Sequence, residues 1–459
     1  MKRILKFPQI LMVLFLLAIV ACSDDDDNDV PQITPDPSIV DLAVGSADLT
    51  TLVDALTRAN LVNTLQGDGP FTVFAPTNSA FNTFLSDNNF SSLDDVPTDL
   101  LTDVLLNHVV SGNNTSTSLS TGYVSSLSTA GAEDRALSLF INTDGGVNIN
   151  GVADVTTADV TASNGVVHIV DAVIGLPNIV DHAIANPDLS SLVGALTDGG
   201  NTTFTDLLSD TATSFTVFAP VNSAFSSFTN PNGNALATIL SYHVVAGDAA
   251  FSDELMNMYV TTAATNGDGD ALSQYINIDD GVTINGASSV AAADIVATNG
   301  VIHAVDAVID LPTVVTFAVA DPNFSTLVEA LTTLTPSVDF AGVLSAQDGN
   351  GDDPFTVFAP TNDAFAALSA IPAEADLIPI LQHHVVAGAN VRSGDLTDGI
   401  SATTLEGDDI TINLPGTGDN IADITDGAGN MGIGIIAVDV QANNGVIHVV
   451  NQVLLPDTN

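Results

Sequence analysis

A chain of 459 residues that is 46% apolar is long enough for roughly three domains of about 150 residues each. Its formal net charge of −49, with 55 acidic residues against 6 lysines and arginines, excludes a nucleic-acid partner, because phosphate binding needs a basic surface. The single cysteine excludes internal disulfides.

Residues 1–21 have the layout of a secretion signal. Lys2, Arg3 and Lys6 precede an apolar run that is too short for a comfortable membrane span. Cys22 follows Ile-Val-Ala, which resembles the lipobox of bacterial lipoproteins, so we expect the leader to be removed and the Cys22 thiol to be acylated. An incidental cysteine in an ordinary signal peptide is the alternative.

Residues 22–36 are expected to be an acidic tether. Four consecutive aspartates, residues 24–27, resemble the tag that sends lipoproteins to the outer face in some Gram-negative lineages, and they also fit a plain solvated charge run. The sequence therefore predicts a secreted protein, lipid-anchored in the outer membrane and displayed on the cell surface. The mature chain keeps three cations, Arg58, Arg135 and Arg392, and no lysine.

Two phrases recur three times. FTVFAPTNSAF at residues 71–81 returns as FTVFAPVNSAF at 215–225 and FTVFAPTNDAF at 355–365, and NGVVHIVDAVI at 164–174 returns at 299–309 and, as NGVIHVVNQVL, at 444–454. The period is a domain length, too long for a solenoid repeat. We therefore expect three similar domains at residues 37–176, 177–311 and 312–456.

Each domain is expected to open with a short apolar segment and then a helix. Leu49, Leu52, Val53 and Leu56 lie at helical spacing, with Asp48 as the expected N-cap. The first repeated phrase then predicts a short strand, a turn at proline, and a second helix that starts near Asn78.

The second half of each domain is expected to be β-structure. Residues 141–151 and 276–286 have Asp-Gly or Gly-Gly turns typical of hairpins. The closing phrase alternates as a strand does. The predicted fold class is therefore α+β.

Histidines recur at two places in each domain. A metal pair or an acid/base site is the functional interpretation, and a core histidine bonded to backbone is the structural one, favoured by the apolar surroundings. The residues are His108, His243 and His384 at the first place and His168, His303 and His448 at the second.

Two acidic loops present oxygen ligands at alternate positions, which suggests calcium. The first holds Asn266, Asp268 and Asp270, and the second holds Asp348, Asn350 and Asp352. Neither continues as an EF-hand, and a flexible acidic turn is the alternative for both. No other cofactor is expected, because motifs for phosphate loops, nucleophile elbows and zinc proteases are missing from the sequence.

The two phrases and the Tyr-His type site between them, Tyr242-His243 in the second domain, resemble the signature segments of the fasciclin domain. Asn107 and His383 replace the tyrosine in the other two copies. The resemblance implies three tandem fasciclin domains, each a wedge of short β-strands packed with several helices. It also implies a role in extracellular adhesion or matrix association.

In animal fasciclin proteins a peptide just before the closing signature is associated with integrin binding. The corresponding pairs here are Asp159-Val160, Asp294-Ile295 and Asp439-Val440, and an ordinary loop aspartate before a buried apolar residue is the alternative. We expect a non-enzymatic adhesion protein whose partner is an extracellular protein or glycan surface. A module that binds polysaccharide or a small ligand is the alternative.

Overall fold

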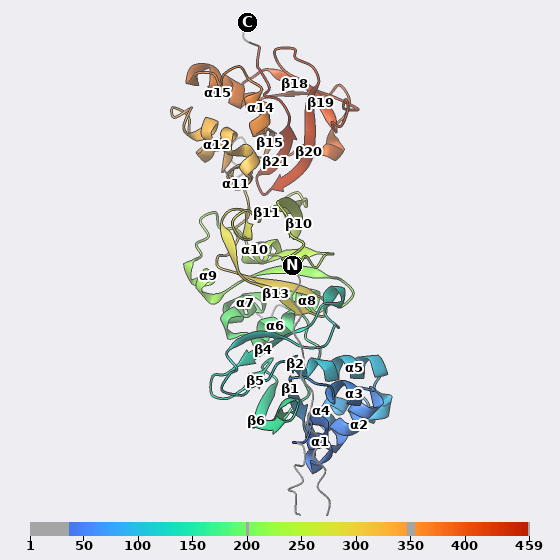
Figure 1. The fold of residues 1–459 in the computed structure, drawn as a ribbon. Coiled ribbons are helices and arrows are strands. Elements are labelled where there is room, and N and C mark those ends of the chain that lie inside the picture. Colours follow the sequence, from blue (N-terminus) through green and yellow to red (C-terminus); the bar gives the residue numbers. More distant parts are fainter. Residues whose placement is uncertain (1–35, 199–201, 347–353, 458–459) are drawn as a thin grey trace, which may run out of the picture. The chain divides into compact units, whose positions relative to one another are not determined.

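The structure is a computed structural model that describes residues 36–198, 202–346 and 354–457. Pro37–Asn459 form one compact unit, and Figure 1 shows its course from blue to red. The leader, Cys22 and the tether up to residue 35 lie outside the described residues. Among the described helices, none is long and apolar enough to cross a bilayer.

The first domain has the order predicted from its sequence, with helices around the first phrase and strands after it. Its helices are α1 (Ile39–Val44), α2 (Thr50–Arg58), α3 (Val62–Leu65), α4 (Asn78–Asp87) and α5 (Thr98–Asn107). Its strands are β1 (Phe71–Pro76), β2 (Val109–Ser111), β3 (Gly122–Ser125), β4 (Ser138–Asn142), β5 (Asn148–Ile149), β6 (Ala153–Ala162) and β7 (Gly165–Val170).

The second domain repeats this order. Its helices are α6 (Ile179–Ala185), α7 (Ser190–Leu196), α8 (Thr203–Leu208), α9 (Asn222–Ser227) and α10 (Leu236–Tyr242). Its strands are β8 (Phe215–Pro220), β9 (Val244–Ala246), β10 (Met258–Thr265), β11 (Ala271–Asn277), β12 (Thr283–Ile284), β13 (Ser288–Ala297) and β14 (Gly300–Val305).

The third domain repeats the order again. Its helices are α11 (Val314–Ala320), α12 (Ser325–Thr332), α13 (Phe340–Leu344), α14 (Asn362–Ala366) and α15 (Glu374–Gln382). Its strands are β15 (Phe355–Pro360), β16 (Val385–Ala387), β17 (Ser401–Thr403), β18 (Asp409–Asn413), β19 (Ala422–Thr425), β20 (Ile433–Ala442) and β21 (Gly445–Val450).

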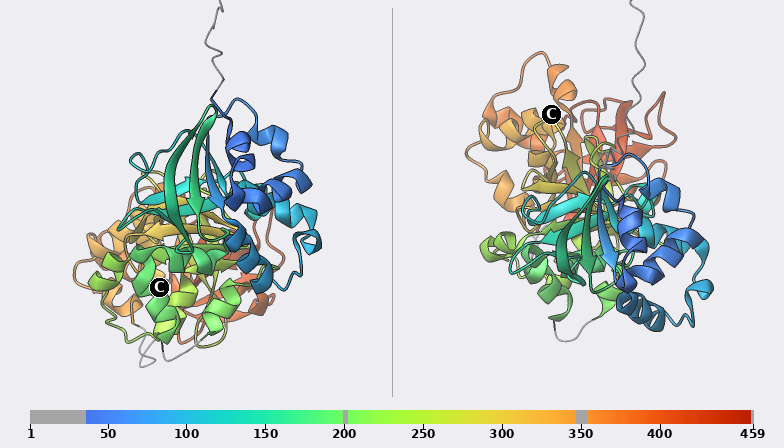
Figure 2. Two further views of the ribbon diagram at one scale, coloured as in Figure 1. Left: turned by 90° about the horizontal axis from the view of Figure 1, so that it is seen from below. Right: turned by 60° about the horizontal axis from the view of Figure 1, so that its bottom comes forward.

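The strands of each domain form a seven-stranded sheet within the described residues, in the order β2-β1-β7-β6-β5-β4-β3 for the first domain. Helices cover one flank of it, as the blue and teal segments in Figure 2 show. Val73 and Ala75 face the helices, whereas Phe74 packs with Val110 and Leu139 on the other face. The predicted α+β class with three tandem domains is confirmed.

The two repeated phrases are partners in the sheet. β1 pairs in parallel with β7, with Phe71 opposite Gly165, and the other domains repeat the register with Phe215 opposite Gly300 and Phe355 opposite Gly445. Gly300 has a φ of +151°, and a Cβ there would collide with the carbonyl oxygen of Phe215. Only glycine fits this backbone approach.

The asparagine of the first phrase caps a helix from a distance. Asn78 Oδ1 accepts the Thr51 N–H at 2.8 Å, and its amide donates to the Ala47 carbonyl. Asn222 and Asn362 repeat these bonds at α7 and α12. The expected N-cap at Asp48 is wrong, because a 3-10 turn, Ala47–Leu49, precedes α2 and Leu49 occupies its N-cap position.

The asparagine of the closing phrase ties together the start and the end of the helical layer. Buried Asn164 accepts the Ile39 N–H and donates to the carbonyls of Leu65 and Gly67. Asn299 and Asn444 make the same three bonds in their domains. Because a buried amide must keep all its bonds, these residues fix α1, α6 and α11 on the sheet.

We predict that Gly300→Ala destabilises the second domain by about 3 kcal/mol or more, because the methyl group meets backbone and the φ is unfavourable for alanine. Gly194→Ala is the matched control. It lies exposed in α7 with open space around its Cβ position, so it should be neutral or stabilise by about 0.5–1 kcal/mol. Urea unfolding measures both, and equal stability of the two variants would contradict the constraint at Gly300.

Candidate functional site

His108, His243 and His384, the first set of histidines, were candidates for a metal or acid/base site. Each lies in the core, just after the helix that precedes the second strand of its domain. His243 Nε2 accepts the Ile309 N–H at 2.9 Å, so its Nδ1–H donates to the Ile239 carbonyl at 2.8 Å. His108 and His384 repeat both bonds. Both ring nitrogens are therefore used, and the tautomer is fixed.

Burial lowers the pKa of these three histidines to about 4. The cause is desolvation, which disfavours the charged ring and outweighs the backbone carbonyl that favours it. At neutral pH each ring is neutral and has no free lone pair for a metal or a substrate proton. Among the described residues, no group of three or more histidine, cysteine or acidic side chains could hold a metal ion.

The second set of histidines lies beside the aspartates that resemble an adhesion motif. His168 stacks on Phe74 with ring centroids 5.6 Å apart, and its Nε2–H donates to the Asn114 carbonyl. The Asp159 N–H lies 3.3 Å from Nδ1. His303 makes the same contacts with Phe218, Ala250 and Asp294, and His448 contacts Phe358 and donates to Val391.

Asp159, Asp294 and Asp439 each lie at an irregularity in the long strand and have left-handed backbone, with φ of 62°, 59° and 60°. Asp159 accepts both the backbone N–H and the hydroxyl of Ser116, at 2.7 and 2.5 Å. Ser252 and Ser393 hold Asp294 and Asp439 in the same way. The Ser116 bonds lower the pKa of Asp159. The following residues, Val160, Ile295 and Val440, pack inward.

Serine, aspartate and histidine thus meet in all three domains, but their bonds differ from those of a nucleophilic relay. In a relay the histidine accepts from the serine hydroxyl and donates to the carboxylate. Here Ser252 Oγ donates to Asp294, and His303 uses its nitrogens for a backbone carbonyl and a backbone N–H. These bonds hold the irregularity of the strand at each aspartate, which we call the bulge, against the loop that carries the serine.

The position before the first histidine differs between domains. Tyr242 is buried, donates to the Ser273 carbonyl at 2.5 Å and receives the Asn285 amide. Asn107 donates to the Gly175 carbonyl, and its Oδ1 is buried without a partner among the described residues. His383 contacts Thr404 and accepts the Gly427 N–H. The tyrosine contact is therefore confined to the second domain.

The acidic loop at residues 266–270 closes on itself. Asn266 Oδ1 accepts the N–H groups of Asp268 and Asp270. Asp270 also receives Arg392 at 3.0 Å and Asn390 at 3.0 Å, so a calcium ion would compete with an arginine there. The calcium site stays a prediction for this loop, and the loop with Asp348, Asn350 and Asp352 lies outside the described residues.

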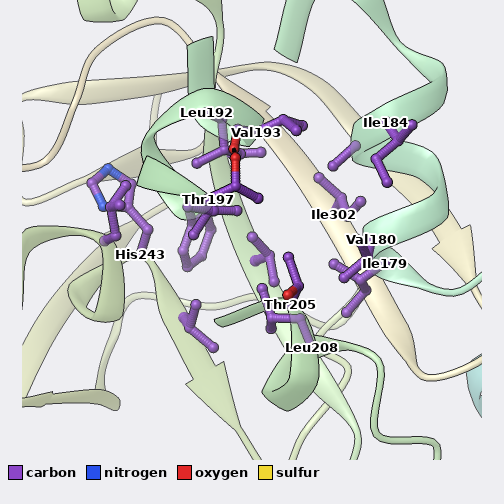
Figure 3. Close-up of a pocket in the computed structure, with 17 residues that line it drawn as sticks. Ile179, Val180, Ile184, Leu192, Val193, Thr197, Thr205, Leu208, His243 and Ile302 are labelled. Carbon is purple, nitrogen blue, oxygen red and sulfur yellow. Dashed lines mark hydrogen bonds between the residues drawn. The ribbon is translucent and has the colours of Figure 1, made fainter. Parts of the chain in front are cut away.

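Small apolar cavities lie between the helices and the sheet. The cavity in the second domain, drawn in Figure 3, has a volume of about 60 Å³ and is lined by Ile179, Leu192, Leu208 and Ile302, with His243 at its edge. The equivalent cavities hold about 40 and 20 Å³. Ligand pockets are usually about 300–1,000 Å³, so these are packing defects.

Two larger grooves lie where consecutive domains meet, and nothing in the sequence pointed to them. One has a volume of about 690 Å³ and is lined by Phe84, Val152 and Ile184 with Asp87 and Asp181. The other has about 510 Å³, with Tyr259, Ile436, Asp279 and Asp321 in its walls. Because each groove combines residues from two domains, single-domain patterns could not reveal it.

The sequence profile of the fasciclin domain matches residues 47–177, 187–312 and 322–456. Protein sll1483 of Synechocystis is 42% identical over 137 residues, which are 30% of this chain and 72% of that protein. Transforming growth factor-beta-induced protein ig-h3 of Sus scrofa is 28% identical over 426 residues. That match covers 89% of this chain and 56% of the relative, so the chain corresponds to about half of it.

Among solved structures, a FAS1 domain pair from the insect cell adhesion molecule fasciclin I is similar, with a TM-score of 0.39 and 19% identity. The match covers 57% of this chain and 97% of the other.

The buried histidines predict a loss of stability in acid. Their folded pKa of about 4 lies below the unfolded value of about 6.5. Their contribution is therefore complete above pH 6.5 and is lost as the pH falls from 6.5 to 4, by roughly 3 kcal/mol for each ring.

Urea unfolding between pH 7 and 4 measures this loss. His243→Gln should cost about 2–3 kcal/mol at pH 7, because two buried backbone groups lose their partner, yet make the second domain less sensitive to pH. If the free energy of unfolding of His243→Gln falls with pH as steeply as that of the wild type, the assignment of this pH dependence to His243 is wrong.

Proposed function

The chain belongs to the fasciclin domain family, and from this premise we propose that it is a surface-anchored, non-enzymatic protein for cell adhesion or matrix association. The observation that carries the proposal is the internal use of the repeated polar groups. The three first-set histidines spend both ring nitrogens on backbone groups, and the three bulge aspartates are held by serines. The repeated polar residues therefore build the same structural framework in each of the three domains.

Tandem copies of one framework suit adhesion. Several weak contacts on one chain gain affinity through effective concentration when their spacing matches the target. The partner we propose is an extracellular protein or glycan surface. A field of net charge −49 repels nucleic acid and anionic lipid headgroups and favours partners that carry cationic groups or bound divalent ions.

Binding of a polysaccharide or a small ligand is the second candidate, and the two grooves between domains favour it. Val152 and Ile184 line the first groove with 59% and 65% of their surface exposed. The charged residues in the walls of both grooves are aspartates. Apolar walls with a few polar groups are the usual composition of a ligand site, and sugar rings present apolar faces and hydroxyl donors that such walls accept.

Cys22 is the proposed site of membrane attachment. Its lipobox-like context supports a diacyl anchor, and two acyl chains hold a protein on a bilayer stably where one does not. Residues 22–36 would then act as the tether, and the outer membrane surface of a Gram-negative cell is the proposed location.

Adhesion can be tested with beads that carry the protein, incubated with extracted cell-surface glycans and proteins. We expect binding above that of a polyanion of matched charge. In the variant Asp159→Asn, Asp294→Asn, Asp439→Asn binding should persist, because asparagine tolerates left-handed backbone and can still bond the serines. Binding equal to the polyanion would contradict adhesion, and a folded triple variant that fails to bind would make the aspartates contact residues.

The anchor can be tested in cells that express the full chain. The wild-type protein should incorporate labelled palmitate and sediment with membranes, whereas Cys22→Ala should lose the label and appear in the soluble fraction. Cys22→Ser is a second thiol-free control with nearly the same side-chain volume. A variant that stays in the membrane fraction without label would contradict acylation at this residue.

A further inference from the structure

The first and second domains meet through the edge of one sheet and the first helix of the next. Tyr123 of β3 packs edge-on against His182 of α6, with ring centroids 5.6 Å apart. The second and third domains meet in the same way, with Tyr259 of β10 against Phe317 of α11, also at 5.6 Å. We call these two contacts the first joint and the second joint.

A hydrogen bond to backbone is repeated as well. Ser138 Oγ, in β4, accepts the Val296 N–H of β13 at 2.9 Å across the first joint. Ser273 Oγ, in β11, accepts the Gln441 N–H of β20 at 3.0 Å across the second. Equivalent strands thus supply equivalent atoms, so one docking geometry is used twice.

Each joint also has a charged contact, the anchor, and it joins the same two segments in both. On the sheet side it is the residue three before the serine, Arg135 or Asp270. On the other side it lies at the loop whose serine holds the bulge aspartate. There Phe251 precedes Ser252, and Arg392 precedes Ser393.

In the first joint the cation is on the sheet side. Arg135 makes a bidentate pair with Asp253 at 3.1 and 2.9 Å and reaches Glu254 at 2.9 Å. Its guanidinium lies 4.2 Å from the centroid of the Phe251 ring. An arginine over an aromatic face and against a carboxylate is a favourable arrangement for this side chain.

In the second joint the cation is on the opposite side. Asp270, at the position of Arg135, accepts Arg392 at 3.0 Å, and Arg392 stands at the position of Phe251. Asn390 donates to the same carboxylate, and Gln441 donates to Asn390. The pair is therefore embedded in a polar network that includes the backbone link of the joint.

Cations are scarce in this chain, which makes their placement informative. From residue 37 onward there are three arginines and no lysine. Two of the three lie in the joints, and Arg58 donates to the carbonyls of Leu93 and Asp94 within the first domain. In the first domain the position of Phe251 and Arg392 is Thr115, directly before Ser116, which is neither aromatic nor cationic.

We propose that the joints are one docking interface with a reversed anchor, and that the reversal assigns each domain its correct neighbour. If the sheet edge of the first domain met the third domain, Arg135 would face Arg392. If the sheet edge of the second domain met the second domain of another copy, Asp270 would face Asp253 and Glu254. In both incorrect pairings like charges would face each other. Their repulsion disfavours the pairing, although the other contacts of the interface could still form.

The proposal can be tested by amide hydrogen exchange on the full chain with Asp270→Arg, Arg392→Asp and the double variant that exchanges the two residues. Each single variant should speed exchange of the Gln441 amide, about fivefold or more, and leave the Val296 amide of the first joint unchanged. The double variant should return Gln441 toward the wild-type rate.

The two single variants change the net charge in opposite directions, so an effect of net charge alone would change the exchange rate of the Gln441 amide in opposite directions. The Phe358 amide, bonded to the His384 carbonyl, should stay protected and shows that the third domain is folded. The proposal is overturned if the single variants leave Gln441 unchanged, or if the double variant exchanges as fast as they do.

Discussion

The parallel pairing of the two repeated phrases is the contact on which each domain depends. It joins the first strand of the domain, which follows the first helices, to the strand that closes the domain, and the two lie side by side next to one edge strand of the sheet. The glycine opposite Phe215 permits this approach, and the neighbouring Asn299 then fixes the first helix and the end of α8. A change in this strand pair would disturb the sheet and the helical layer together.

Polar residues buried beside this pairing serve the framework. His243 bridges the end of α10 and the backbone after β14, and Ser252 clamps the bulge at Asp294. A side chain whose donors and acceptors are all used is poorly placed for proton transfer, since catalysis would first break bonds that the fold needs. This is the physical basis for proposing adhesion, in which partners bind to the outer surface and in the grooves between domains.

Electrostatics acts chiefly between domains. With 49 acidic residues and 3 cations from residue 37 onward, self-repulsion opposes close approach of domains. Arg135 and Arg392 sit where two domains meet and neutralise carboxylates there. Tyr259 of the second joint lines one groove, and α6 of the first joint places Asp181 and Ile184 in the wall of the other, so the contacts that hold the domains also set the shape of the two grooves.

The sequence by itself determined the three domains, the α+β order and the core positions, because these follow from local periodicity and from phrases that recur in register. It also indicated that the histidines are core residues. Local pattern failed at Asp48, whose expected cap is supplied by Asn78 from another element, and it gave no sign of the role of Ser116, Arg135 or Arg392. Tertiary structure alone decided those, because each acts on a residue far along the chain, and a hydrogen bond between distant segments leaves no periodicity in the sequence.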